Sequence, residues 1–125
     1  FAVSSTNEIQ QVTESMVGKV DVIYIFTDNT IAANMPTVAM VATENNIPCI
    51  VGEGGMVDAG GLATYGIDYK RLGEMTAEQA IRILKDGEDI SKMPIEFMSD
   101  EDCTLKINEE VAAQLGITIP EELKK

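Results

Sequence analysis

The stretch VIYIFTDNT (residues 22–30) passes without a break from a run of apolar residues to four small polar ones. An uninterrupted apolar run is typical of a strand that is covered on both faces in a parallel sheet. The polar residues Thr27 to Thr30 follow this strand and precede a helix in which Pro36 fits the first turn. The stretch therefore predicts a strand–helix unit of an α/β protein, with a polar loop at the carboxyl end of its strand.

The same alternation of segments continues on both sides of this unit. Ser5 and Glu8 have the spacing of a capping box, and Gly18 ends the apolar pattern that follows, so a helix is predicted over residues 6–17. Strands are predicted over 20–26, 47–51, 62–67, 95–98 and 104–107, and further helices from Pro36 to Glu44, over 70–86 and over 109–115, the last two capped by Asp68 and Asn108. This order predicts a Rossmann-like parallel α/β sheet with helices on both faces and right-handed crossovers.

Composition argues against several classes of function. The chain has 125 residues, enough for one domain with a core, and a formal net charge of −12, which argues against binding to nucleic acid. It contains no histidine, so histidine-based catalysis and histidine metal sites are excluded, and no nucleophile with a visible base stands out. Cys49 and Cys103 have no metal-binding spacing and are interpreted as two thiols, with a single disulfide between them as the alternative. We therefore expect a protein that is not an enzyme and has no metal and no cofactor.

Polar residues at the ends of two predicted strands are the candidate ligand-binding groups. Ligands of open parallel sheets bind outside the carboxyl ends of the strands, where both Thr27 to Thr30 and the loop after Val51 are expected. A helix that opens at Thr30 favours an anion, and the Asp28 carboxylate suits an ammonium group. Asn29 offers both a donor and an acceptor. This set predicts a site for a zwitterion.

The loop after the second strand, Gly52 to Gly55, adds Glu53 as a further acidic partner and Gly54 as a place where backbone can approach a ligand closely. Its glycines fit neither a P-loop nor a dinucleotide-binding motif. A structural interpretation stays open, since Asp, Asn and Thr are common helix caps. A catalytic carboxylate pair of Asp28 and Glu53 is a weaker hypothesis, because the sequence does not fix their separation.

Three stretches of the chain carry a resemblance to a known family. The sequence from STNEIQ to YKRLG (residues 5–73), together with AIRILKDGEDISKMPIE (80–96) and LKINEEVAAQLGITIP (105–120), resembles substrate-binding proteins of ABC transporters in the tryptophan/tyrosine-type group. The resemblance implies the type I periplasmic-binding-protein fold, in which two Rossmann-like lobes clamp a ligand between them. It covers nearly the whole chain, which resembles the C-terminal portion only.

The resemblance also implies a set of binding residues and a role. It places Thr27, Asp28, Asn29 and Thr30 in the cleft, together with the loop around Glu53 and Gly54, and adds Ser5 and its neighbour Ser4 as further candidates. It implies an amino-acid ligand, often an aromatic one, which agrees with the zwitterion argument.

The same resemblance implies partners and a location. The expected partner is the membrane permease of an ABC importer, and the expected location is extracytoplasmic, in the periplasm or lipid-anchored at the outer face of the cell membrane. The alternatives are the effector-binding lobe of a transcription regulator, which shares this architecture, and a small flavodoxin-like enzyme domain.

The resemblance finally implies how the chain is organised. Residues 1–125 are expected to form the C-terminal lobe of a two-lobe solute-binding protein, with residues 70–90 packed on the N-terminal lobe or on another copy. Leu72, Met75, Ile83 and Leu84 would otherwise expose an apolar stripe. We therefore expect this chain to form a homodimer or to exchange its helix between copies.

Overall fold

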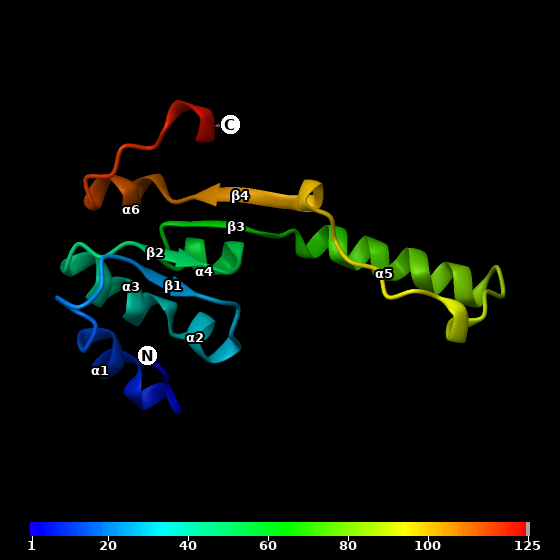
Figure 1. Cartoon of the computed structure of the whole chain (residues 1–125), viewed down its shortest axis with the longest axis horizontal. Coiled ribbons are helices and arrows are strands. Elements are labelled where there is room, and N and C mark those ends of the chain that lie inside the picture. Colours follow the sequence, from blue (N-terminus) through cyan, green and yellow to red (C-terminus); the bar gives the residue numbers. More distant parts are fainter. Residues whose placement is uncertain (125) are drawn as a thin grey trace. The chain divides into compact units, whose positions relative to one another are not determined.

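The strand predicted from the opening stretch is present in the computed structural model, which describes residues 1–124. The chain divides into two units, which are described separately. The sheet unit comprises Phe1–Gly66 and the chain from Leu105 on, and the helical unit comprises Ile67–Thr104 (Figure 1).

Four strands form one sheet in the order β1 (Ile23–Ile25), β2 (Cys49–Val51), β3 (Ala63–Ile67) and β4 (Cys103–Ile107). The first three strands are parallel, with Ile23 opposite Cys49 and Ile50 opposite Ala63. β4 runs in the opposite direction beside β3 (Figure 1). The predicted parallel α/β sheet is therefore confirmed for its first three strands and extended by one antiparallel strand.

Most helices of the sheet unit cover one face of the sheet. They are η1 (Thr6–Glu8), α1 (Ile9–Glu14), α2 (Asn29–Ala33), α3 (Met35–Glu44) and α4 (Gly54–Asp58). Their buried residues meet the inward residues of β1 and β2 in one core, of which Ile9, Met35, Val51, Met56 and Val57 are the largest fully buried members. Pro36 lies in the first turn of α3, as predicted. This core holds the carboxyl ends of β1 and β2 in place.

The opposite face of the sheet is covered by α6 (Glu109–Gln114). Val111 and Ala112 of this helix pack with Leu62 and with partly buried Ile50 and Ala63. The Asn108 side chain caps α6 by accepting from Val111 N at 3.1 Å, which confirms the predicted cap. Helices therefore lie on both faces, as expected.

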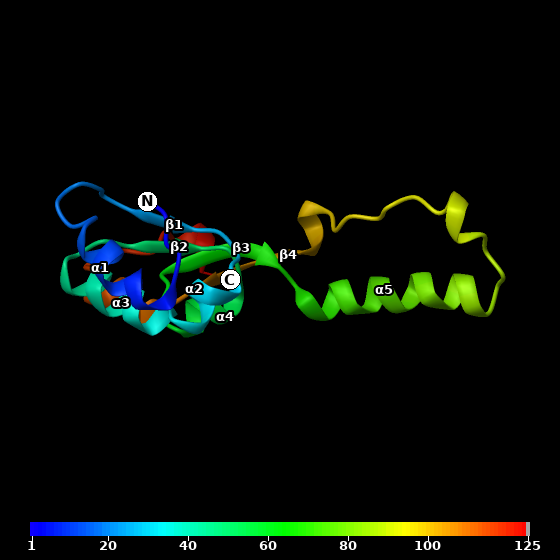
Figure 2. The same ribbon diagram turned by 90° about the horizontal axis from the view of Figure 1, so that it is seen from below.

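The helical unit consists of α5 (Tyr69–Leu84) and a return segment with the short helices η2 (Ile90–Lys92) and η3 (Asp100–Asp102) (Figure 2). Asp68 caps α5 as predicted, accepting from Lys70 N at 2.8 Å. None of the α5 residues is buried. Ion pairs of Arg82 with Glu96 and of Arg71 with Asp102 tie the return segment to α5.

Four details of local structure differ from the sequence predictions. The capping box at Ser5 does not form, since Ser5 makes no capping bond and Glu8 Oε2 accepts from Ser4 N instead. The predicted helix over 6–17 is accordingly shorter, with regular α-helix only at Ile9–Glu14. The predicted strand over 95–98 is not a strand, and the side chains of Ile95 and Phe97 are about four-fifths exposed. The glycine-rich loop after β2 contains a short helix, α4.

Candidate functional site

The carboxyl ends of the three parallel strands lie against one another. A Cβ atom built on Gly52 would be 2.6 Å from the Thr27 nitrogen and from Thr27 Oγ1. A Cβ atom on Gly66 would be 2.9 Å from the Gly52 oxygen and 3.6 Å from Glu53 Cα. The two polar loops of the sequence therefore meet at one edge, and glycine is needed there because the backbones approach so closely.

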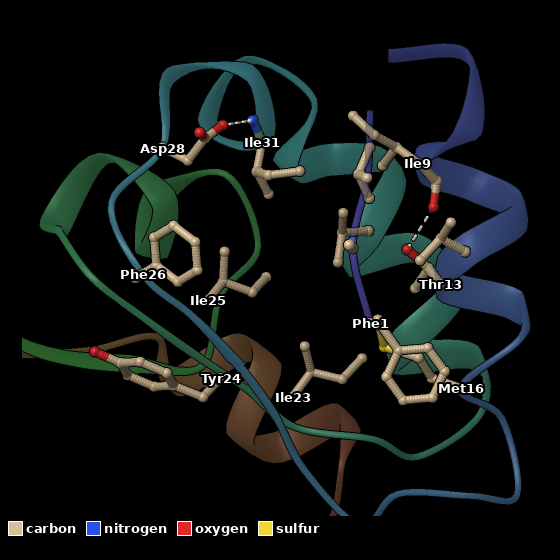
Figure 3. Close-up of a pocket in the computed structure, with 14 residues that line it drawn as sticks. Phe1, Ile9, Thr13, Met16, Ile23, Tyr24, Ile25, Phe26, Asp28 and Ile31 are labelled. Carbon is tan, nitrogen blue, oxygen red and sulfur yellow. Dashed lines mark hydrogen bonds between the residues drawn. The ribbon is translucent and has the colours of Figure 1, made fainter. Parts of the chain in front are cut away.

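Asp28 is half-buried at this edge and serves as the N-cap of α2. Its Oδ1 accepts from Ile31 N at 2.9 Å, and this leaves Oδ2 available to another donor. The carboxylate can therefore support the loop and bind a cationic group at the same time. Figure 3 shows Asp28 beside Phe26, with the cap bond to Ile31 dashed.

Glu53 makes two backbone hydrogen bonds that the sequence did not predict. It is the N-cap of α4, with Oε2 accepting from Gly55 N at 2.7 Å and Oε1 accepting from Met56 N at 2.8 Å. Both oxygens are thus engaged by backbone, so a ligand that used Glu53 would share or displace a capping bond. Its first role is to fix the loop after β2.

The remaining predicted site residues are less well placed to bind a ligand. Asn29 and Thr30 are exposed and begin α2, which has only five residues. The few aligned peptide groups of one turn give a weaker anion-attracting end than we expected at Thr30. Gly54 begins α4, and Ser5 lies exposed before η1 in the N-terminal segment.

An apolar groove and a lysine near this edge were not predicted. The groove has a volume of about 290 Å³ and is lined by Tyr24 and Phe26 of the β1 region, by Asp28, and by the first residues of the chain (Figure 3). The aromatic residues at alternate positions 24 and 26 were the feature of the sequence that could have indicated this groove. Lys106 binds Asp58 with Nζ 2.6 Å from Oδ2, and its stem lies next to Gly54. Lys106 was missed because it belongs to a strand distant in sequence.

Two kinds of structural feature, a metal site and a membrane-spanning helix, were sought in the described residues. Within residues 1–124, no cluster of three or more Asp, Glu or Cys side chains is arranged to hold a metal ion. The helices of the same residues are all too short or too polar to cross a membrane.

Comparison with known proteins gives one family for the whole chain. The sequence profile of the family described as "ABC transporter substrate binding protein" matches residues 1–125. A "Tyrosine-binding protein" of Clostridioides difficile is 41% identical over 115 residues, covering 92% of this chain and 32% of the relative.

Solved structures agree with this match. A domain from Streptococcus pneumonia described as in complex with L-Trp is 38% identical, with a TM-score of 0.86 over 99% of this chain and 41% of that one. A ligand-free, open substrate binding protein with adhesive properties from Clostridium difficile is 43% identical, with a TM-score of 0.73 over 95% of this chain and 39% of that one. The chain thus spans about one third to two fifths of the length of the proteins that it matches.

Proposed function

Because the chain belongs to the ABC transporter substrate-binding protein family, we propose that it forms part of a solute-binding protein whose ligand is an amino acid, with aromatic amino acids as the first candidates. Proteins of this family bind a solute and do not transform it. The names of two relatives support the ligand class, since one is a tyrosine-binding protein and another was solved with L-Trp.

The observation that carries this proposal is the meeting of polar residues at the carboxyl ends of β1 and β2. Asp28 keeps Oδ2 free of its cap bond and is the candidate partner of the ligand's ammonium group. Thr27, Asn29 and Thr30 are exposed beside it and offer hydroxyl and amide groups to a carboxylate. Glu53 and Gly54 shape the neighbouring loop through the α4 cap.

The proposed site is one wall of a cleft between two lobes. We assign residues 1–125 to the C-terminal lobe, with residues 70–90 packing on the N-terminal lobe or on another copy. Support comes from the helical unit, where Leu72, Ile81 and Leu84 are exposed by 38%, 52% and 85%. Ligand contacts to both lobes would then favour a closed state that is recognised by a membrane permease.

The proposal extends to location. A solute-binding protein that serves an importer works outside the cytoplasm, in the periplasm or lipid-anchored to the outer face of the membrane. Fractionation of cells that express the full-length parent protein tests this part, and a wholly cytoplasmic pool would contradict it.

The ligand is tested by titration calorimetry of the full-length parent protein with L-tryptophan, L-tyrosine, L-phenylalanine and L-leucine. Tryptamine lacks the carboxylate and indole-3-propionate lacks the ammonium group, so each measures one half of the zwitterion. A ligand at about a hundred times its Kd should also stabilise the folded protein by roughly 2.7 kcal/mol. If none of the four amino acids binds, the proposal of an amino-acid ligand is wrong, whereas the family assignment stands.

The role of Asp28 is tested by Asp28→Asn in the parent protein. Asparagine caps helices about as well as aspartate, so the Tm should change little while the charge is lost. We expect affinity for the intact amino acid to fall by roughly tenfold or more, because a hydrogen bond to a charged group contributes about 1.5–3 kcal/mol.

Asp68→Asn is the matched control, since Asp68 caps α5 in the same way. This variant should bind with unchanged affinity. Equal affinities of Asp28→Asn and the wild type would show that Asp28 is only a cap. Indole-3-propionate should be insensitive to Asp28→Asn, because it has no ammonium group to lose.

A further inference from the structure

The short helix α4 follows one of the two polar loops of the candidate site and has little stability of its own. It has five residues, and its first turn begins with two glycines, Gly54 and Gly55. Glycine is less favourable than alanine in a helix by about 1 kcal/mol per residue, and isolated helices of this length do not persist in water. Contacts with the rest of the sheet unit must therefore hold α4 in place.

The core holds the middle of α4. Met56 and Val57 are each 1% exposed and belong to the core cluster that also contains the inward residues of β1 and β2. The two ends of the helix are less well covered, since Gly54 is half-buried and Asp58 is exposed. The position of the first turn therefore depends on contacts outside this core.

The side chain of Lys106, which belongs to β4, reaches both ends of α4. A Cβ atom built on Gly54 would lie 3.4 Å from Lys106 Cδ and 3.8 Å from Lys106 Nζ. The same Nζ is 2.6 Å from Asp58 Oδ2. The lysine thus lies along the helix from its first residue to its last, with its apolar stem against the backbone and its ammonium group at the carboxylate.

The charge of Lys106 suits the end of the helix that it binds. Asp58 is the last residue of α4, where the unpaired carbonyls of a helix disfavour a carboxylate and favour a cation. Asn108, two residues after Lys106, donates from Nδ2 to Val57 O at 3.1 Å. The end of β4 and the residue that follows it therefore supply two side chains to the carboxyl end of α4, and Lys106 extends from there to its start.

We propose that Lys106 is a positioning residue of the candidate site, which holds the first turn of α4 and, through this turn, Glu53 and Gly54. Glu53 accepts from Gly55 N and Met56 N, so its carboxylate keeps its place only while the turn is formed. Lys106 acts through the helix and does not contact the ligand. The effect on binding rests on the proposed function, whereas the support of α4 does not depend on any ligand.

Amide exchange with solvent in the full-length parent protein, measured by NMR without ligand, tests the support of α4. We expect Lys106→Ala to speed exchange of the Gly55 and Met56 amides by about twofold to fivefold, the effect of losing an exposed ion pair. The amide of Ile23, which is bonded within the sheet, should be unchanged. Lys19→Ala is the matched control, because it removes an exposed lysine from the same unit. Unchanged exchange at Gly55 and Met56 in Lys106→Ala would overturn the proposal.

Calorimetry of the parent protein tests the positioning role, with L-tryptophan, L-tyrosine, L-phenylalanine or L-leucine, whichever binds most tightly. We expect Lys106→Ala and Asp58→Asn each to weaken binding by about twofold to fivefold, because affinity falls with the fraction of molecules in which the site is formed. The double variant should bind like either single variant, since both substitutions remove the same pair. Lys106→Arg keeps the charge and should retain the affinity.

The outcomes separate this role from two others. If Lys106→Ala weakens binding and Asp58→Asn does not, Lys106 contacts the ligand itself and the positioning role is wrong. If neither variant changes the affinity although exchange in α4 is faster, Lys106 supports the helix without positioning the site, which also overturns the proposal. If the wild type binds none of the four amino acids, the proposed ligand class is wrong, and the exchange measurement alone decides whether Lys106 holds α4.

Discussion

Gly52 is the residue at which the two polar loops touch. A methyl group there would lie 2.6 Å from the Thr27 nitrogen, and a backbone atom cannot move aside as a flexible side chain can. We expect Gly52→Ala to lower the free energy of unfolding by about 1–3 kcal/mol through overpacking. Urea unfolding of the parent protein measures this change.

Gly54→Ala is the matched control for Gly52→Ala. A Cβ atom on Gly54 would lie 3.4 Å from Lys106 Cδ, the end of a flexible stem, and Gly54 begins α4. Alanine is favoured over glycine in helices by up to about 1 kcal/mol, so this variant should be neutral or slightly more stable. A loss equal to that of Gly52→Ala would contradict the close approach of the loops.

The two cysteines differ in burial. Cys49 is 3% exposed in the core, and burial raises the pKa of its thiol to about 11, whereas Cys103 is half-buried. The thiolate is the reactive form, so at pH 8 we expect one thiol to react quickly with a disulfide reagent and the second only on unfolding. A fast phase that persists in Cys103→Ser would show that Cys49 is accessible.

Single residues show where sequence reasoning about the site succeeds. Asp68 and Asn108 were predicted as caps and are caps, because short acidic and amide side chains reach the backbone two or three residues ahead. Glu53 also caps α4, which the sequence did not predict because the longer glutamate side chain folds back in a way that composition does not indicate. Its contact with a ligand stays a prediction. The Gly52 contact with Thr27 joins distant positions, which one sequence does not reveal.

At the scale of elements, continuous runs of apolar residues correctly predicted three of the strands. The runs at 20–26, 47–51 and 62–67 contain β1, β2 and β3, although only the residues that pair are regular strand. The prediction of a strand at 95–98 is wrong because an extended segment becomes a strand only beside a partner strand, which is a non-local property. The antiparallel direction of β4 depends on the same kind of information.

The return segment of the helical unit depends on ionised carboxylates. A hydrogen bond from Arg82, with another from Gln79, lowers the pKa of Glu96 below its ordinary value of 4.5. The Ser99 hydroxyl and N–H, followed by Arg71, lower the pKa of Asp102. A depressed folded pKa stabilises the folded state above the unfolded value, and this stabilisation is lost as the pH falls through the folded pKa.

We therefore expect residues 85–102 to separate from α5 in acid, below about pH 4.5, before the sheet unit unfolds. Amide NMR signals followed from pH 6 to pH 2 measure this opening, with the β1 and β2 signals as reference. High salt should shift it toward milder acid, because the pairs are exposed and screened. Signals of this segment that stay unchanged to pH 2 would contradict the role of these pairs, and Glu96→Gln should open the segment at neutral pH.

At the scale of the molecule, the two units differ in how they are stabilised. The sheet unit has a core of fully buried side chains, whereas no residue of α5 is buried in this chain. α5 has 16 residues, little more than the length of about 12–15 residues below which isolated helices are marginal in water. Most helical stability in proteins comes from packing of an apolar face. Ile81 and Leu84 of α5 are exposed, which is the condition that the proposed packing on the N-terminal lobe or on another copy requires.

Limited proteolysis tests which surface α5 uses. In the dilute 125-residue chain we expect the first cleavages within residues 69–104, because opening of this segment costs little free energy. In the parent protein these sites should resist, since residues 70–90 are proposed to pack on the N-terminal lobe. Leu84→Glu should restore cleavage in the parent, while Lys85→Glu, which changes a charge on an exposed side chain next to it, should not. If protection of the 125-residue chain rises with its concentration, α5 packs on another copy. If the chain and the parent are cleaved equally at every concentration, α5 packs neither on the N-terminal lobe nor on another copy.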